Sequence, residues 1–353
     1  MVLELYENYT AGVFAPVDDI GAFSSLRWRR KYFEAGEVEV HLLPTARNVA
    51  DMQAGRILLR QDAIEGCIIH DVSLTEVELA IEGRMLSHIL KDRVIYPTFS
   101  FSGKAEVAMR KLVEAYAITN NPIPMLRLGQ LNGFAETVEQ LQVTGKDLLT
   151  TLTAIAKASL IGFRIRPDVE NNALWFEAYK GTDRTDPETV EQPVEFSPEN
   201  KNMENASIEE HDGDYYNFAY VAGEGEGEAR TIVPVDQTGG EYRREMWVDA
   251  RDLQKGGLTA AQYSAILKQR GAEKLAVCKM LRSFSADAID RAGSAYKKDW
   301  DLGDTVAASR EDWGAYRTDM VTEAEEVFEG VAEAPTVTPT LGSGLPETID
   351  LES

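Results

Sequence analysis

The spacing of apolar residues changes twice along this chain of 353 residues, and these changes limit the possible folds more than any other feature. Over residues 1–100, apolar and polar residues alternate in short segments, as at Val38, Val40 and Leu42. Alternation is typical of strands with one buried face, and a series of short strands separated by turns indicates a small barrel or sandwich. The first hundred residues therefore predict a β-barrel domain.

Residues 101–185 show a different spacing. Apolar residues recur every three to four positions at the start of this stretch, which predicts an amphipathic helix; they are Ala105, Met109, Leu112 and Tyr116. A second helix is expected to open at the capping-box-like sequence 144–147 and to stop at Gly162. Strand patterns at 163–166 and 174–179, with turn residues between them, predict a hairpin. The stretch is therefore expected to be a helix-helix-hairpin α/β module.

The alternating pattern returns after residue 185. Pro187, Pro193 and Pro198 interrupt a polar stretch and mark a boundary. Beyond it, strand patterns continue to about residue 330, with one inserted helix at about 259–281 that begins with the capping sequence 259–262. We therefore expect a second β-barrel domain over residues 186–330.

A weak internal repeat favours two related barrels. Gly55 to Gly83 and Gly303 to Gly330 carry glycines and strand patterns at matching offsets. The predicted fold class is accordingly α+β and multi-domain, with two small β-barrel domains flanking the α/β module. The remaining residues, 331–353, are rich in Pro, Thr, Gly and acid, lack a core pattern, and are expected to be extended or disordered unless they dock on a partner.

Charge limits the partners of this chain. It has 59 acidic and 36 basic residues, a formal net charge of −23, and such a surface repels nucleic acid unless a local basic patch overrides it. No apolar run approaches the roughly 18–20 residues that cross a bilayer, and residues 1–17 lack the pattern of a secretion signal. We expect synthesis in a cytosol and no membrane insertion by this chain.

The residues that usually carry chemistry do not form a known pattern. The histidines, His41, His70, His88 and His211, lack the spacing of a helical zinc pair, and two distant cysteines cannot form a disulfide framework or a clustered thiolate site. The glycine-rich segment 223–227 is interleaved with acids, which would repel a phosphate. A carboxylate pair for glycoside hydrolysis stays open, because spacing in sequence does not give distance. We expect no catalytic residues, no metal site and no cofactor.

One short basic cluster is a candidate functional site. Arg27, Arg29 and Lys31 alternate with Trp28 in a strand pattern, so the basic side chains share one face, opposite Trp28 and Tyr32. Arginine beside an aromatic residue can bind nucleic acid, but the acidic protein around it favours an acidic neighbour, within the fold or across a subunit boundary. The candidate subunit interface is a set of four residues: Arg27, Arg29, Arg30 and Lys31.

The order of several motifs resembles a family of siphophage tail proteins. The motifs are RRKYFEAGEVEVHLLP at 29–44, Gly83-Arg84 with Leu90 and 93–96, TDRT at 182–185, NFAYV at 217–221, REMWVDARDL at 244–253 and DLGD at 301–304. Each motif is weak alone, and the ordered series covers about residues 1 to 330. The family is that of tail-tip hub or Tal-like baseplate hub proteins, related to the hub under the spike of contractile tails.

The resemblance implies a structural role. It implies a homotrimer whose six barrels match the sixfold tail tube, with the distal tail protein, the tube and the tape-measure protein as partners. The ring would close the tube at the virion tail tip and let DNA pass without specific binding. The chain would be made in the cytoplasm of a host bacterium, and we expect it to lack the cell-wall hydrolase that many Tal-like proteins carry after the second barrel.

Two other functions remain open from the sequence. A tail-tip receptor-binding or adsorption protein would need an exposed aromatic platform for carbohydrate, whereas the aromatic content is 8% without clustered Trp. A tail-associated cell-wall hydrolase is the other alternative, and clearing in a cell-wall zymogram would identify it.

Overall fold

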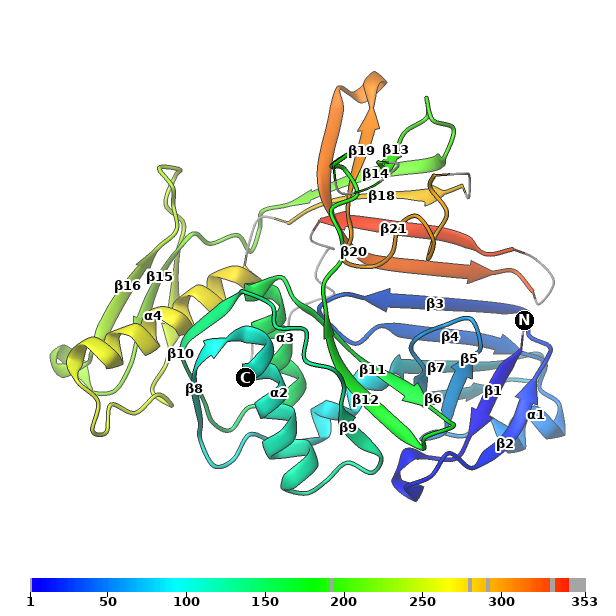
Figure 1. Cartoon of the computed structure of the whole chain (residues 1–353), viewed down its shortest axis with the longest axis horizontal. Helices are drawn as coiled ribbons and strands as arrows, with labels where there is room; N and C mark the ends of the chain where they lie inside the picture. Colours follow the sequence, from blue (N-terminus) through cyan, green and yellow to red (C-terminus); the bar gives the residue numbers. More distant parts are fainter. Residues whose placement is uncertain are drawn as a thin grey trace.

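The computed structural model describes residues 2–188, 190, 193–278, 281–289, 293–330 and 334–342. Strands dominate these residues, and the helices gather in two places (Figure 1). The α+β class expected from the sequence is therefore confirmed.

A 13-stranded sheet runs through both halves of the chain, in the order β14-β18-β21-β20-β3-β4-β7-β6-β5-β1-β2, with β13 and β19 attached beside β20. Its N-terminal strands are β1 Leu3–Tyr6, β2 Pro16–Ile20, β3 Ser25–Lys31, β4 Glu37–Leu42, β5 Ile57–Arg60, β6 Cys67–Leu74 and β7 Leu79–Met85. Its C-terminal strands are β13 Glu195–Phe196, β14 Met203–His211, β18 Leu281–Ala288, β19 Thr305–Arg310, β20 Ala315–Phe328 and β21 Thr336–Gly342.

The two halves of this sheet join where β20 pairs with β3. The antiparallel register runs from Glu323 opposite Lys31 to Phe328 opposite Leu26, and β3 and β20 lie side by side in Figure 1. Among the described residues the sheet runs from β14 to β2 without closing on itself. The strands expected in two separate barrels therefore share one hydrogen-bonded sheet, and closed barrels stay a prediction.

The internal repeat is only partly visible in the structure. The N-terminal segment forms three strands, β5, β6 and β7, whereas its C-terminal counterpart forms two, β19 and β20. The difference lies in β20, which continues through 14 residues without a turn. Its first part pairs with β19 and its second part with β3 and β21, so one long strand links three neighbours.

The helical module lies between the two halves of the sheet in sequence. Its elements are β8 Phe99–Lys104, α2 Ala105–Val113, η3 Glu114–Thr119, β9 Leu126–Leu128, β10 Thr137–Val143, α3 Leu148–Ser159, β11 Gly162–Asp168 and β12 Ala173–Tyr179. Asp147 caps α3 by accepting a hydrogen bond from the Thr150 backbone N–H. The expected stop at Gly162 is wrong, because α3 ends at Ser159. The next residue, Leu160, has a left-handed φ of 55°, and Gly162 begins β11.

A small β-α unit is inserted between β14 and β18. It comprises β15 Phe218–Ala222, η4 Gly227–Ala229, β16 Ile232–Asp236, β17 Glu245–Asp249 and α4 Ala260–Val277. Thr259 and Gln262 form the capping box that the sequence predicts for α4. Val221, Val233 and Leu267 pack together in a core of their own, at the left of Figure 1. The insertion is thus larger than the single helix expected.

The residues after 330 contribute to the sheet. The sequence shows no core pattern there, yet Thr336–Gly342 forms β21 between β18 and β20, with Val337 and Leu341 buried. Val337, Pro339 and Leu341 alternate with threonines, so one face of this short strand is buried. Residues 331–333 and 343–353 lie outside the described residues. The remaining elements are η1 Tyr9–Ala11, α1 Ala46–Asp51, η2 Leu86–Asp92 and η5 Glu311–Trp313.

Candidate functional site

The basic cluster lies on β3, at the junction of the two halves of the sheet. Alternation along the strand buries Leu26 and Trp28 and leaves Arg27 and Arg29 on the other face, as the sequence predicts. Arg30 belongs to the buried face, where its side chain is 1% exposed. The four candidate residues therefore occupy two environments.

On the outer face, Arg29 belongs to a row of alternating charges that crosses four strands. Glu325, Arg29, Glu37 and Arg84 are successive partners in the register of β20, β3, β4 and β7. Arg29 Nη2 lies 2.7 Å from Glu325 Oε2, and Arg84 Nη1 pairs with Glu37 Oε1. Opposite charges in directly facing positions stabilise the pairing of strands, so this row helps to align β3 between its neighbours.

Arg27 and Lys31 flank this row and are also paired within the chain. Arg27 Nη1 lies 3.2 Å from Glu39 Oε2, and Lys31 Nζ lies 3.4 Å from Glu37 Oε1. The Arg27 side chain is 52% exposed, so it can still contact another molecule. Of the four candidate residues, Arg27 is the most accessible.

On the inner face, Arg30 binds acidic and phenolic groups from distant segments. Arg30 Nε donates to Glu65 Oε1 at 2.8 Å, and Arg30 Nη1 donates to Asp301 Oδ1 at 2.8 Å and to Tyr296 Oη at 3.0 Å. Glu65 is 4% exposed, so its charge has little water to stabilise it. The buried guanidinium therefore connects β3 to the segment that follows β5 and to the segment before β19.

A second buried ion pair connects the same halves. Arg60 Nη2 lies 2.6 Å from Glu326 Oε2, and both side chains are almost fully buried. The Trp28 and Phe328 rings each lie 5.1 Å from the Arg60 guanidinium, a distance at which a cation is attracted to an aromatic face. Burial lowers the pKa of Lys297, while the adjacent Glu326 opposes that shift.

Tyr32 fills the space beside these ion pairs. Its ring lies against the backbone at Gly162 and at Gly303, and Gly181 packs closely on the backbone of Gly303. Its hydroxyl donates to the Tyr179 carbonyl oxygen at 3.0 Å, and burial raises the pKa of Tyr32 to about 12. The hydroxyl therefore stays protonated, and it links β3 to the end of β12.

A small hollow of about 100 Å³ lies on the charged outer face, lined by Arg27, Glu37, Val38, Glu39, His70, Asp71, Glu82, Gly83 and Arg84. Opposite charges alternate along its walls. Within the described part of the chain, no group of three His, Cys, Asp or Glu side chains is placed to hold a metal ion. Burial raises the pKa of Cys67 and of Cys278, which keeps both thiols in the less nucleophilic protonated form.

His70 of this hollow and the neighbouring His88 are expected to make the stability of the fold depend on pH. The rings of His70 and His88 are 4.9 Å apart. Burial, followed by the effect of His70, lowers the pKa of His88 to about 4, below the value of about 6.5 for an unfolded chain. Between these two pH values the unfolded chain binds more protons than the folded one, so stability falls as the pH drops from about 6.5 to about 4.

We expect His88→Gln to flatten this pH dependence. Thermal denaturation followed from pH 7 to pH 4 should show a smaller decrease in Tm for the variant than for the wild type. His211→Gln, which changes a surface histidine, is the matched control and should retain the wild-type decrease. A His88→Gln profile that parallels the wild type would contradict the assignment.

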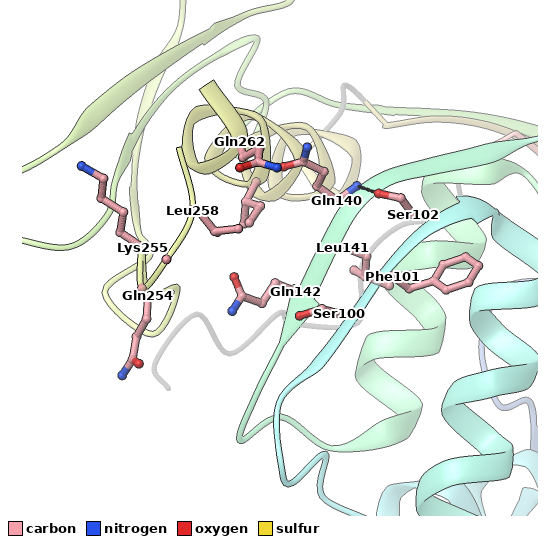
Figure 2. Close-up of a pocket in the computed structure, with 13 residues that line it drawn as sticks. Ser100, Phe101, Ser102, Gln140, Leu141, Gln142, Gln254, Lys255, Leu258 and Gln262 are labelled. Carbon is pink, nitrogen blue, oxygen red and sulfur yellow. Dashed lines mark hydrogen bonds between the residues drawn. The ribbon is translucent and has the colours of Figure 1, made fainter. Parts of the chain in front are cut away.

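A larger groove of about 570 Å³ lies between the helical module and the small β-α unit, beside the contact of α4 with β10 (Figure 2). Its walls are β8 and β10 on one side and residues 254–258 with α4 on the other. The sequence did not indicate it, because its glutamines lie in segments more than a hundred residues apart and form no motif.

Comparison with known proteins relates the whole chain to phage proteins. The family model described as Siphovirus ReqiPepy6 Gp37-like protein matches residues 11–343. No curated protein matches. None of the helices in the described ranges is both long and apolar enough to span a membrane.

Several solved structures share the fold at low sequence identity. The tail protein from Neisseria meningitidis MC58 is 13% identical with a TM-score of 0.56, covering 97% of this chain and 96% of its own. The prophage MuSo2 43 kDa tail protein from Shewanella oneidensis is 11% identical with a TM-score of 0.55, and the match covers 99% of this chain and 100% of that protein. Prophage tail protein gp18 from Listeria monocytogenes EGD-e is 12% identical with a TM-score of 0.54, and the match covers 98% of this chain and 95% of that protein.

Proposed function

Because the chain belongs to the Siphovirus ReqiPepy6 Gp37-like protein family, we propose that it is a structural subunit of a bacteriophage tail-tip hub. The observation that carries this proposal is the family match over residues 11–343. The likeness in fold to three tail proteins over almost their whole lengths supports it. In this proposal the chain acts in the virion and has no catalytic role.

The proposed assembly is a homotrimeric ring that closes the tail tube and lets DNA pass. Each subunit contributes two barrel-like domains, residues 1–100 and 186–330, on either side of the module 101–185. One cluster of buried apolar residues comes mostly from residues 3–85 and another mostly from residues 194–341, which supports two units but does not fix these bounds. The distal tail protein, the tube and the tape-measure protein are the proposed neighbours.

The acidic surface suits a passage for DNA. Three copies would carry three times the net charge of −23, and carboxylates along a wall weaken contact with a polyanion. The same charge makes subunits repel one another, so contacts between them need basic side chains that meet acidic ones. Arg27 has the exposure for such a contact, whereas Arg30 is occupied inside the fold.

The oligomeric state of the purified chain tests the proposal. Light scattering after size-exclusion chromatography should give three times the chain mass of 39.1 kDa, and negative-stain images should show a ring with a central hole. A monomer at every concentration, with no ring when the distal tail protein is added, would overturn the hub assignment.

Charge reversal at Arg27 should weaken the ring. We expect Arg27→Glu to raise the dissociation constant of the trimer by at least about tenfold, since it replaces an attraction across the interface by a repulsion. Sedimentation at several concentrations measures this effect. Arg251→Glu, which reverses a more exposed arginine on the small β-α unit, is the control, and equal assembly of both variants would exclude β3 from the interface.

A further inference from the structure

The three-stranded sheet of the small β-α unit has one covered face and one open face. Val221, Val233 and Val248, one from each strand, pack against α4, which lies beside β15 and β16 in Figure 1. Successive side chains of a strand point to opposite faces, so the residues next to these valines belong to the other face. That face is open to solvent, because Trp247 is 55% exposed.

Three ring-bearing side chains form a row across the open face, which we call the ring row. Pro234, Tyr220 and Trp247 are direct partners in the register of β16, β15 and β17. Neighbouring strands lie about 4.8 Å apart, so the row is about 10 Å long, comparable with a disaccharide. The sequence shows no cluster of aromatic residues here, and the fold brings the two aromatic rings together from separate strands.

Two arginines hold the aromatic rings of this row in place. Arg243 Nη2 donates to Tyr220 Oη at 2.7 Å, and its guanidinium carbon lies 5.5 Å from the centre of that ring. The Arg230 guanidinium carbon lies 5.7 Å from the Trp247 ring centre, and Arg230 Nη2 donates to the Ala222 carbonyl oxygen at 2.9 Å. The rings are thus positioned before a ligand arrives, which lowers the entropy cost of binding.

Exposed carboxylates flank the ring row on the same face. Asp249 and Asp236 lie two positions beyond the ring row in their strands. A hydrogen bond from Arg251 lowers the pKa of Asp249 to about 2, and the Thr238 backbone N–H lowers the pKa of Asp236. Both groups are therefore ionised at neutral pH. An ionised carboxylate has about four acceptor sites, so each can accept further hydrogen bonds from a ligand.

The area and charge of the open face favour a neutral saccharide over a macromolecule. Its three strands have five residues each, so the face covers roughly 240 Å² at the usual strand spacing and rise. A specific protein–protein interface buries about 800 Å² on each partner. Nucleic acid bases also stack on aromatic rings, but the carboxylates repel their phosphates. A pyranose ring offers axial C–H groups to an aromatic ring and equatorial hydroxyls to carboxylate acceptors.

We propose that the open face of β16, β15 and β17 binds a neutral oligosaccharide whose pyranose rings lie on Tyr220 and Trp247. Hydroxyl groups at the edges of the sugar rings donate to Asp249 and Asp236. This site lies on a different unit from β3, so it gives the chain an adhesive role that does not depend on ring assembly.

A printed array of neutral oligosaccharides built from glucose, galactose and N-acetylglucosamine, probed with the full chain, tests this proposal. At least one of them should bind. Saturation-transfer NMR with that oligosaccharide should give the strongest signals on the axial C–H protons of one sugar face. Trp247→Ala should raise its dissociation constant by at least about tenfold, because it removes the more exposed aromatic ring of the row.

Trp313→Ala is the matched control. Trp313 is 47% exposed and its ring centre lies 4.4 Å from the Arg310 guanidinium carbon, but it belongs to η5 and is outside the ring row, so this variant should bind like the wild type. Both variants should unfold close to the wild-type temperature because each removes an exposed ring.

Two results would overturn this assignment of the open face. One is that no oligosaccharide on the array binds, or that Trp247→Ala binds as well as the wild type. The other is self-association of the chain that Trp247→Ala removes, which would assign the face to a second copy instead.

Discussion

Arg30→Ala should lower the free energy of unfolding by about 3–5 kcal/mol, the usual effect of removing one partner from a buried ion pair. The substitution leaves Glu65, which is 4% exposed, without the guanidinium 2.8 Å away. It also removes the link to Asp301 and Tyr296. Urea denaturation followed by circular dichroism measures the change.

Arg27→Ala is the matched control for this prediction. Arg27 is three residues away on the same strand and is also paired with acids, but its side chain is 52% exposed. Exposed ion pairs contribute at most about 1 kcal/mol, so this variant should unfold close to the wild type. Equal effects of the two substitutions would show that the burial of Arg30 has no energetic consequence.

Gly303→Ala should be the other strongly destabilising substitution. Gly303 has a φ of 90°, and a Cβ atom there would lie 2.3 Å from Cε2 of the Tyr32 ring. A left-handed conformation costs a residue with a side chain about 1–3 kcal/mol, and overpacking a core adds about 1–3 kcal/mol. We expect a loss of about 2–6 kcal/mol in thermal or urea denaturation.

Gly314→Ala separates these two causes. Gly314 has a φ of 63°, but nothing lies within 4 Å of its Cβ position, so this variant should lose only the conformational cost of about 1–3 kcal/mol. If Gly303→Ala loses no more than Gly314→Ala, the Tyr32 ring has room to move and the three-glycine contact is not tight.

Local features of this fold could be predicted from the sequence. The capping residue Thr259 indicated where α4 begins, and the capping-box-like sequence 144–147 placed the start of α3 within a few residues of its actual start at Leu148. Alternation along β3 separated Arg27 and Arg29 from Trp28. The same alternation places Arg30 on the face of Trp28, which indicates that Arg30 is buried. We nevertheless grouped Arg30 with the exposed arginines because it lies in a run of basic residues.

Long-range features could not be predicted in this way. The pairing of β20 with β3 joins residues about 300 positions apart. Alternation of apolar and polar residues indicates which face of a strand is buried, but it does not show which other strand pairs with it. The groove is likewise made by Gln142 and Gln262 from different units. Neutral amides have no characteristic spacing, so only the folded arrangement shows that they converge.

The pairing of β20 with β3 also sets an order of events during synthesis. Arg29 leaves the ribosome 296 residues before Glu325, a delay of roughly 15–60 s at about 5–20 residues per second. Through that interval one edge of β3 has no partner strand, because the acidic strand β20 that pairs with it has not yet been synthesised. The nascent N-terminal half must therefore stay soluble with an unpaired, positively charged strand edge until residues 323–328 have been translated.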